Sequence, residues 1–392
     1  MSLQATVVVP YFEDARLLDL VLRALELQTL PADAFEVVVA DDGSRVAPDP
    51  GERPYAVSVV RQDDLGCRPG VARNVGSRLG TGPVLVWIDG DTVPEPAYLE
   101  ELLRVCDGRR LTVGRRLHAD LSATTPDELA AWLTTGEDPP ERLPEPAWLA
   151  EGYAVSDDLA RTDLRSYRYV ISAVLACPRW LFERVGGFAE QINGYGGEDW
   201  EFARRCWLAG ADFAHAPRAV AWHDGPDLGG RFEDVGAVKD GETLRIAGLI
   251  TDPHLRGRGL LWPYPRFVVR FAMPKDVREV RRLACAEGLL RTGDVGVWLG
   301  TDAATASPDP RLHRGLPGPE VLGRAELIVD VHAPVRTDET SLEAWQAAAP
   351  ARSASVVVRS PRDLALDLPC AELPEPEALP VDLQLERWFD RR

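Results

Sequence analysis

Short apolar runs alternate with helical segments through the first hundred residues, and this alternation constrains the fold more than any other feature. Residues 5–10 (ATVVVP) are too short for a helix and too apolar for a half-exposed strand, which indicates a buried parallel strand, and residues 35–40 (FEVVVA) predict a second. Two further short runs also predict strands: 57–61 (VSVVR) and 84–88 (VLVWI). Helical patterns at residues 14–29 and 70–79 separate them. We therefore expect an α/β unit with a Rossmann-like, mostly parallel central sheet and right-handed crossovers.

Acidic residues follow three of these predicted strands. Glu13 comes after the first strand, Asp41-Asp42 after the second and Asp89-Gly90-Asp91 after the fourth. The carboxyl ends of parallel strands meet at one edge of a sheet, where ligands of open α/β folds bind. The sequence therefore predicts a ligand site rich in carboxylates at this edge.

The overall charge limits the partners of such a chain. Its 392 residues include 44 Lys and Arg against 62 Asp and Glu, which gives a formal net charge of −18. Nucleic acids and anionic membranes attract basic surfaces, so we expect neither as a partner. An anionic substrate would need a bound cation to offset the repulsion. Only two of the 44 basic residues are lysine, a bias that a GC-rich bacterial genome would explain.

Cysteines and hydropathy indicate the compartment. The six cysteines form no CxxC pair or tight cluster, which favours reduced, mostly buried thiols over disulfides or a zinc site. No apolar run approaches the ~18 residues that a membrane span needs, and no signal-peptide pattern begins the chain. We expect a cytoplasmic protein without an integral membrane segment.

The pattern changes past about residue 240. Strand-like runs recur at four places, with helical segments near 276–290 and 340–349: 266–273, 295–299, 326–331 and 355–359. We expect a catalytic domain over 1–235 and a smaller α/β accessory domain over 240–392, of unknown role, through which the chain could form a homodimer. Arg256-Gly257-Arg258-Gly259 also leaves open an acyltransferase-like interpretation of this second domain.

Two aspartate motifs each have a structural and a functional interpretation. Asp89-Gly90-Asp91 is by itself most often a turn, but two carboxylates on one side of an extended chain could hold a divalent cation. Asp41-Asp42 before Gly43-Ser44 could end a strand or accept hydrogen bonds from a nucleobase or ribose.

Two further candidates lie later in the chain. Glu198-Asp199 follows two glycines at a helix start, where the helix dipole alone favours acidic residues; the functional alternative is a general base facing a glycine-lined cleft. His223 is by itself most often a structural histidine, and its interpretation as a metal ligand depends on Asp91. A mixed carboxylate–imidazole pair suits Mn²⁺ better than Ca²⁺.

In chain order, these pieces resemble family 2 glycosyltransferases of the GT-A fold. The resemblance rests on VVVPYFE, VVVADDGS, GVARNVG and VWIDGDTVPEP, the last containing the Asp-X-Asp motif of such enzymes. A second block, from VGGF through GYGGEDWEFARRCWLAGADF to AWH, looks like the catalytic half shared with β-1,4-galactosyltransferases and GalNAc-transferases. Together they cover roughly residues 4–225.

The resemblance implies how the nucleotide is bound. Pro10, Tyr11 and Glu13 after the first strand would line the pocket. Asp41 or Asp42 after the second strand would meet the uracil, and Arg73 on the predicted helix 70–79 would lie near the base or the diphosphate.

The same resemblance implies the catalytic roles. Asp89 would contact the donor ribose or sugar, and Asp91 would bind Mn²⁺ or Mg²⁺ with His223 as second ligand. Glu198 would contact the sugar or acceptor, and Asp199 would deprotonate the acceptor hydroxyl. Tyr195 and Trp200 are candidates for stacking on a sugar.

The function implied is an inverting, metal-dependent transfer of a hexose or N-acetylhexosamine from a UDP-sugar to an acceptor hydroxyl. Residues 172–178 (SAVLACP) lack the asparagine often seen before the Gly-Gly-Phe turn, so the sugar is left open, as is the acceptor. The alternative is a non-catalytic nucleotide-sugar or glycan-binding scaffold, although such a module would have no use for a base.

Overall fold

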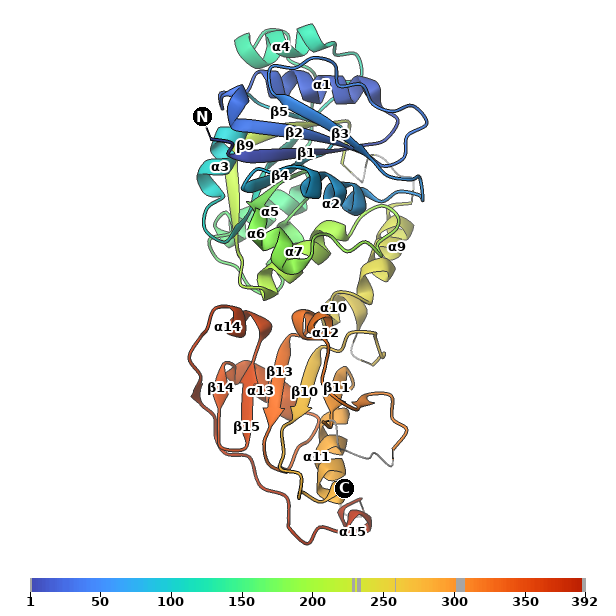
Figure 1. Cartoon of the computed structure of the whole chain (residues 1–392), viewed down its shortest axis with the longest axis vertical. Coiled ribbons are helices and arrows are strands. Elements are labelled where there is room, and N and C mark those ends of the chain that lie inside the picture. Colours follow the sequence, from blue (N-terminus) through green and yellow to red (C-terminus); the bar gives the residue numbers. More distant parts are fainter. Residues whose placement is uncertain (1, 228–229, 231–233, 258, 301–306, 390–392) are drawn as a thin grey trace. The chain divides into compact units, whose positions relative to one another are not determined.

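The computed structural model describes residues 2–227, 230, 234–257, 259–300 and 307–389 (Figure 1). Its contacts divide the chain into two units: Met1–Trp207 with Ala211–Ile246, and Leu208–Gly210 with Ala247–Arg392. The division falls at the end of helix α9 (Val235–Ala247), whereas the predicted boundary at 235–240 lies near its start. Helix α9 therefore belongs to the first unit.

The first unit is built on one sheet with the strand order β3-β2-β1-β4-β8-β6-β9-β5, and β7 pairs with β6. Its first four strands are parallel, as predicted: β1 (Ala5–Tyr11), β2 (Phe35–Asp41), β3 (Ala56–Arg61) and β4 (Val84–Ile88). Antiparallel pairing to β8 then extends the sheet. The remaining strands are β5 (Thr92–Pro94), β6 (Arg110–Ala119), β7 (Arg142–Leu143), β8 (Val174–Pro178) and β9 (Asp212–Asp224).

Helices cover both faces of this sheet (Figure 1). Helices α1 and α4 lie on one face, and α2, α6 and α7 lie on the other. The bounds are α1 (Ala15–Glu26), α2 (Pro69–Leu79), α3 (Tyr98–Val105), α4 (Pro126–Thr135), α5 (Ala147–Ser156), α6 (Arg179–Val185) and α7 (Glu198–Leu208), with single 3₁₀ turns η1 (Ala32–Ala34) and η2 (Ser166–Tyr169).

An aromatic cluster holds α7 against the end of β4. Trp87 lies two residues before Asp89 and packs edge-on against Phe188 and Phe202, with ring centroids 5.2 and 5.6 Å away. Phe188 and Phe202 stack at 4.4 Å, and all three rings are fully buried. Aromatic packing of this kind adds to the hydrophobic gain from burial. It fixes the acidic start of α7 beside the acidic end of β4.

The second unit is also α/β, as predicted, with the strand order β12-β11-β10-β13-β15-β14-β16. The four predicted runs correspond to β10 (Phe267–Phe271), β11 (Val295–Trp298), β13 (Leu327–Val331) and β15 (Val356–Arg359), of which β15 is antiparallel to β13. The short elements are β12 (Leu312–His313), β14 (Ala351–Arg352), β16 (Ala371–Glu372), α10 (Pro253–Arg256), α12 (Pro319–Arg324), α14 (Pro361–Ala365) and α15 (Leu385–Phe389).

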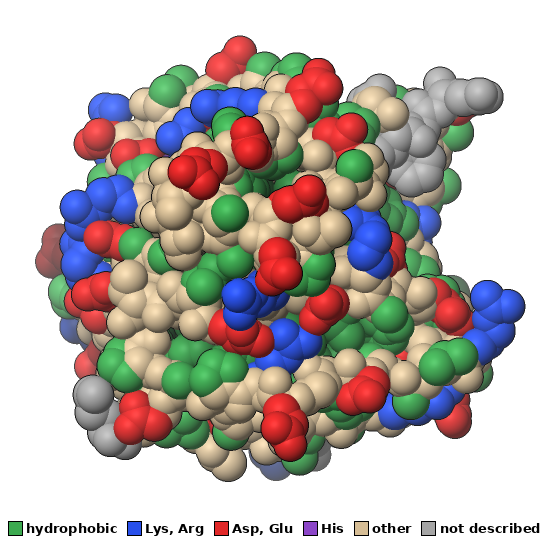
Figure 2. Space-filling view, turned by 90° about the horizontal axis from the view of Figure 1, so that it is seen from above, with side chains coloured by type: hydrophobic (Ala, Val, Ile, Leu, Met, Phe, Trp, Pro, Cys, Tyr) green, Lys and Arg blue, Asp and Glu red, His purple; other side chains and the backbone are tan. Residues whose placement is uncertain are grey.

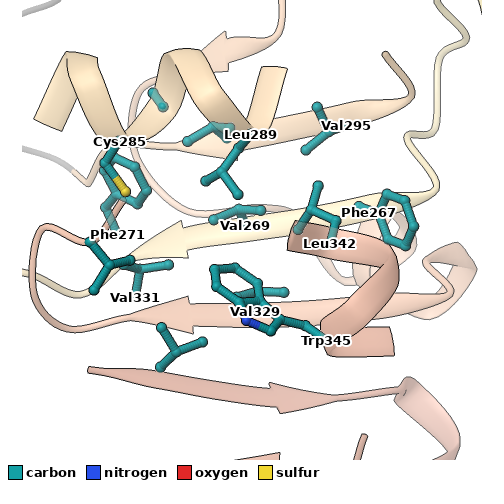
Figure 3. Close-up of a cluster of buried hydrophobic side chains, with 14 of the residues drawn as sticks. Phe267, Val269, Phe271, Cys285, Leu289, Val295, Val329, Val331, Leu342 and Trp345 are labelled. Carbon is teal, nitrogen blue, oxygen red and sulfur yellow. The ribbon is translucent and has the colours of Figure 1, made fainter. Parts of the chain in front are cut away.

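Two helices form the core of this unit with the sheet (Figure 3). Helices α11 (Glu279–Leu290) and α13 (Ser341–Ala348) lie over the central strands. Leu289 of α11 and Leu342 of α13 are completely buried against Val269 and Val329. The unit therefore has a hydrophobic core of its own.

Arg256 of the Arg256–Gly259 motif is itself buried in this unit. Its guanidinium pairs with Asp294 at 2.7 Å, which ties the end of α10 to the start of β11. Arg258 lies outside the described residues. The described part of the motif has a structural partner, and the acyltransferase-like interpretation gains no support from it.

Charges of both signs are interspersed over the face shown in Figure 2, with apolar side chains between them. All six cysteines are free, and four of them are buried: Cys106, Cys177, Cys206 and Cys285. Among the described residues, no helix has both the length and the apolar character needed to cross a bilayer.

We expect Leu289→Ala to lower the free energy of unfolding of the second unit by about 2–5 kcal/mol, because it leaves a cavity under α11. The control is Leu364→Ala on α14, where the side chain is 45% exposed and its loss costs far less. Urea unfolding followed by tryptophan fluorescence measures both. Equal effects of the two changes would contradict the packing described here.

Candidate functional site

A cavity of about 670 Å³ lies in the first unit at the carboxyl ends of β1 and β4. Side chains from separate parts of the chain line it: Pro10 and Tyr11 at the end of β1, Asp42 after β2, Arg73 on α2, Asp89 and Asp91 after β4, Tyr195 in the glycine-rich turn, and Glu198, Asp199 and Trp200 at the start of α7. The edge that the sequence predicted is thus a concave site rich in carboxylates.

Arg73 joins the two acidic segments of the cavity. Its guanidinium donates to Asp89 Oδ1 at 2.6 Å and to Glu198 Oε1 at 2.8 Å. The side chain is only 3% exposed. Desolvation lowers the pKa of Arg73, but the charges of Asp89 and Glu198 outweigh it and raise the pKa above its ordinary value. Arg73 is therefore a permanent cation that neutralises part of the charge of two carboxylates.

The two acidic residues at the start of α7 have different surroundings. Glu198 keeps its second oxygen, Oε2, buried and without a hydrogen-bond partner among the described residues. Asp199 Oδ1 accepts from the backbone N–H of Trp200 at 2.8 Å. Burial, followed by the negative charges of Glu198 and Glu242, raises the pKa of Asp199 to about 7. A carboxylate with such a pKa can take a proton near neutral pH.

Asp91 and His223 lie together because β5 and β9 are antiparallel neighbours, with Thr92 opposite His223. His223 Nε2 is 3.2 Å from Asp91 Oδ2, and His223 Nδ1 faces the carbonyl oxygen of Gly225 at 3.4 Å. Nε2 faces the carboxylate, so the two side chains can hydrogen-bond to each other or together ligate a cation.

This pair fits two ligands of a divalent ion such as Mn²⁺. A carboxylate oxygen and an imidazole nitrogen form the donor set, and the cavity that Asp91 lines leaves room for a bound ligand. Within the part of the chain that the structure describes, no three His, Cys, Asp or Glu side chains gather as a complete metal site. Asp91 and His223 would therefore share the ion with atoms from elsewhere.

Two predicted nucleotide contacts lie outside the cavity lining. Glu13 accepts from the backbone N–H of Arg45 at 2.7 Å and pairs with its side chain. Asp41 is buried, accepts from Ser44 N–H at 2.9 Å and lies 3.4 Å from the Arg61 guanidinium. Both stabilise the turns that end β1 and β2.

Asp42 is the member of the Asp41-Asp42 pair that lines the cavity. Its carboxylate accepts from the backbone N–H of Arg68 at 2.7 Å and from the side-chain amide of Gln62. Of the two predicted aspartates, Asp42 is therefore the one whose position lets it reach a ligand in the cavity.

Several lining residues were not predicted from the sequence. Three come from one face of α9, and others come from α5 and β6: Val235, Lys239, Glu242, Trp148 and Arg116. They belong to no motif. For Val235, Lys239 and Glu242 of α9, the sequence holds one indication: their spacing of four and three residues places them on one face of a helix.

The comparisons with known proteins match the first unit in two segments. Residues 6–129 match the model described as Glycosyl transferase family 2, and residues 157–222 match the model described as N-terminal domain of galactosyltransferase. The two segments together contain every predicted site residue except His223.

Curated relatives have similar sequences over part of their length. The chain is 34% identical over 216 residues to validoxylamine A glucosyltransferase of Streptomyces hygroscopicus, covering 51% of this chain and 50% of that protein. It is 30% identical over 269 residues to chondroitin synthase of Pasteurella multocida, covering 62% of this chain and 26% of that protein. The chain thus spans half or less of the length of these relatives.

Among solved structures, S. aureus TarS is similar with a TM-score of 0.41 and 16% identity, over 64% of this chain and 41% of that chain.

We expect Arg73→Met to destabilise the first unit by about 3–5 kcal/mol, because it leaves the buried Glu198 and the partly buried Asp89 without their counter-charge. The matched control is Arg78→Met on the same helix, which removes an exposed pair with Glu190 and should cost about 0–1 kcal/mol. Thermal unfolding of both variants measures the difference. Equal losses would show that the bridge is not the stabilising element.

Proposed function

We propose that this chain transfers a hexose or N-acetylhexosamine from a UDP-sugar to an acceptor hydroxyl, with inversion and with a divalent cation. The match of residues 6–129 to the model described as Glycosyl transferase family 2 supports the proposal. The observation that carries the proposal is the single cavity that Asp91 and Asp199 both line. A cation ligand and a candidate base therefore face one space large enough for a sugar ring.

Each residue at the site has a part in the proposed reaction. Asp199 accepts the proton of the acceptor hydroxyl as the acceptor oxygen bonds to the anomeric carbon. The bond from that carbon to the diphosphate oxygen breaks, and the nucleoside diphosphate leaves with the electron pair. Attack from the face opposite the leaving group inverts the configuration.

The other groups hold the substrates in place. Asp91 and His223 would hold Mn²⁺ or Mg²⁺, which supplies positive charge for the leaving diphosphate. Arg73 fixes the carboxylates of Asp89 and Glu198, so that each presents its remaining oxygen from a constant position. Preorganised groups of this kind lower the barrier without further reorganisation.

The nucleotide and the sugar would use the remaining lining residues. Pro10, Tyr11 and Asp42 line the part of the cavity at the ends of β1 and β2 and are proposed to bind the nucleotide. Tyr195, which is 47% exposed, and Trp200 offer aromatic faces for a sugar. The cytoplasmic location, the bacterial origin and the homodimer remain predictions.

The catalytic proposal is tested by UDP release from a panel of UDP-sugars with Mn²⁺. Asp91→Ala and Asp199→Asn should each lower turnover by about 10²–10⁴-fold, because one removes a cation ligand and the other removes the base. Asp127→Asn on the exposed start of α4 is the control and should keep full activity. Wild-type turnover in Asp199→Asn would refute the role of Asp199. UDP binding without turnover on any donor would favour the scaffold alternative.

The raised pKa of Asp199 predicts a pH dependence. The base works as a carboxylate, so kcat/KM should be constant above about pH 7 and fall about tenfold per pH unit below it. This falling part is the acidic limb of the pH profile. Initial rates from pH 5.5 to 8.5 at saturating Mn²⁺ measure this limb. A rate that stays constant down to pH 5.5 would contradict the assignment.

The same pKa predicts a trade-off with stability. A carboxyl group whose pKa is raised on folding holds its proton more tightly in the folded state, so its contribution to stability decreases as pH rises from about 4 to 7. Asp199→Asn removes this penalty and should raise the melting temperature at pH 8. An unchanged or lower melting temperature at pH 8 would contradict the raised pKa of Asp199.

A further inference from the structure

Helix α9 contributes an acidic residue to the cavity that no motif and no family match assigns. Both matched segments end before it, at residues 129 and 222. Val235, Lys239 and Glu242 lie four and three residues apart, so they share one face of α9, and all three line the cavity. Glu242 is 6% exposed. A carboxylate that is buried in the wall of the cavity can act electrostatically on the other groups that line it.

The same face of α9 packs on the glycine-rich turn that leads into Glu198 and Asp199. A Cβ on Gly196 would lie 3.2 Å from Glu242 Cδ, and a Cβ on Gly197 would lie 2.5 Å from Ile246 Cγ2. Both glycines have positive φ, 86° and 94°. Arg245 donates to the carbonyl oxygen of Tyr195 in this turn. Helix α9 therefore supports the turn that presents Asp199.

The charges that act on Asp199 come from three helices. Glu198 is its neighbour on α7, and the charges of Arg73 on α2 and Glu242 on α9, which line the same cavity, also act on it. Glu242 Oε2 also accepts a hydrogen bond from Lys239 Nζ at 2.8 Å, which makes the two an ion pair. Lys239 in turn lies over the ring of Trp200, 5.5 Å from its centroid. The influence of Glu242 thus depends on how well Lys239 neutralises it.

We propose that Glu242 is a positioning residue whose negative charge makes Asp199 a stronger base for the acceptor's proton, and that Lys239 limits this effect. A like charge across a partly desolvated cavity disfavours a second negative charge, so it strengthens the attraction of Asp199 for a proton. Lys239 partly cancels that charge. The inference rests on the proposed function, because it assigns Asp199 as the base.

Substitutions of Glu242 and of Lys239 should shift the pH profile of kcat/KM in opposite directions. Glu242→Gln should move the acidic limb of kcat/KM to lower pH, by up to about 1 unit, since Asp199 then loses its proton more easily. Its plateau rate should fall several-fold, because a weaker base removes a proton more slowly. Lys239→Met leaves Glu242 uncompensated and should move the limb to higher pH by a few tenths of a unit.

Asp240→Asn is the matched control, because it removes one negative charge from the exposed side of the same helix. It should leave the limb where the wild-type protein has it. The melting temperature of each variant checks that the fold is intact. Should Glu242→Gln not fold, Lys239→Met still tests the proposal, because it keeps the Glu242 side chain.

Three outcomes would overturn the inference. They are a limb that stays in place in Glu242→Gln and Lys239→Met, a limb that moves in the same direction in both, and a loss of rate in Glu242→Gln without any movement of the limb. The last would mean that Glu242 only supports the glycine turn. Inactivity of Asp199→Asn alongside any of these would leave the proposed function standing, whereas wild-type activity of Asp199→Asn would remove both.

Discussion

The site depends on one guanidinium placed between two carboxylates. Arg73 contacts Asp89, 16 residues later in the chain, and Glu198, 125 residues later. Without this cation, the end of β4 and the start of α7 would bring like charges together in a poorly solvated space. Every proposed role at the site, from binding the donor to accepting a proton, presumes that these two segments stay side by side.

The hydrophobic core holds the end of β4 and the start of α7 next to each other. Trp87 packs against Phe188 and Phe202, so the strand that ends in Asp89 and the helix that begins with Glu198 share one aromatic cluster. The apolar contact fixes the distance between the two elements, and Arg73 then makes their acidic ends compatible. Aromatic packing and charge neutralisation thus act together to hold the end of β4 beside the start of α7.

The sequence predicted the elements well because their patterns are local. Apolar runs of five to eight residues correspond to strands in both units, and the acidic pair at the start of α7 was visible from the preceding glycines. Glu13 and Asp41 show the limit of such reasoning. A carboxylate after a strand can line a cavity or cap a turn, and its hydrogen-bond partners, here Arg45 and Ser44, decide which.

Helix α9 and Arg73 show what local patterns cannot supply. The importance of Arg73 comes from two partners that are brought together only by the fold. Glu242 lies in a segment, VGAVKDGETLRIA, whose weak amphipathic pattern carries no motif and lies where the sequence suggested a domain boundary. The two ion pairs of Arg73 and the place of Glu242 in the cavity depend on tertiary proximity, which the neighbouring residues in the sequence do not reveal.

The charge of the cavity has a consequence for the molecules that enter it. Its described lining holds three cationic side chains against eight carboxylates: Asp14, Asp42, Asp89, Asp91, Glu198, Asp199, Asp227 and Glu242. Arg73, Arg116 and Lys239 are all engaged in ion pairs with members of that set. Without a bound cation, an incoming anion would meet a repulsive field, the proposed nucleoside diphosphate included, whereas an ammonium group or an uncharged polyol would not. Acceptors without a negative charge therefore suit this lining best.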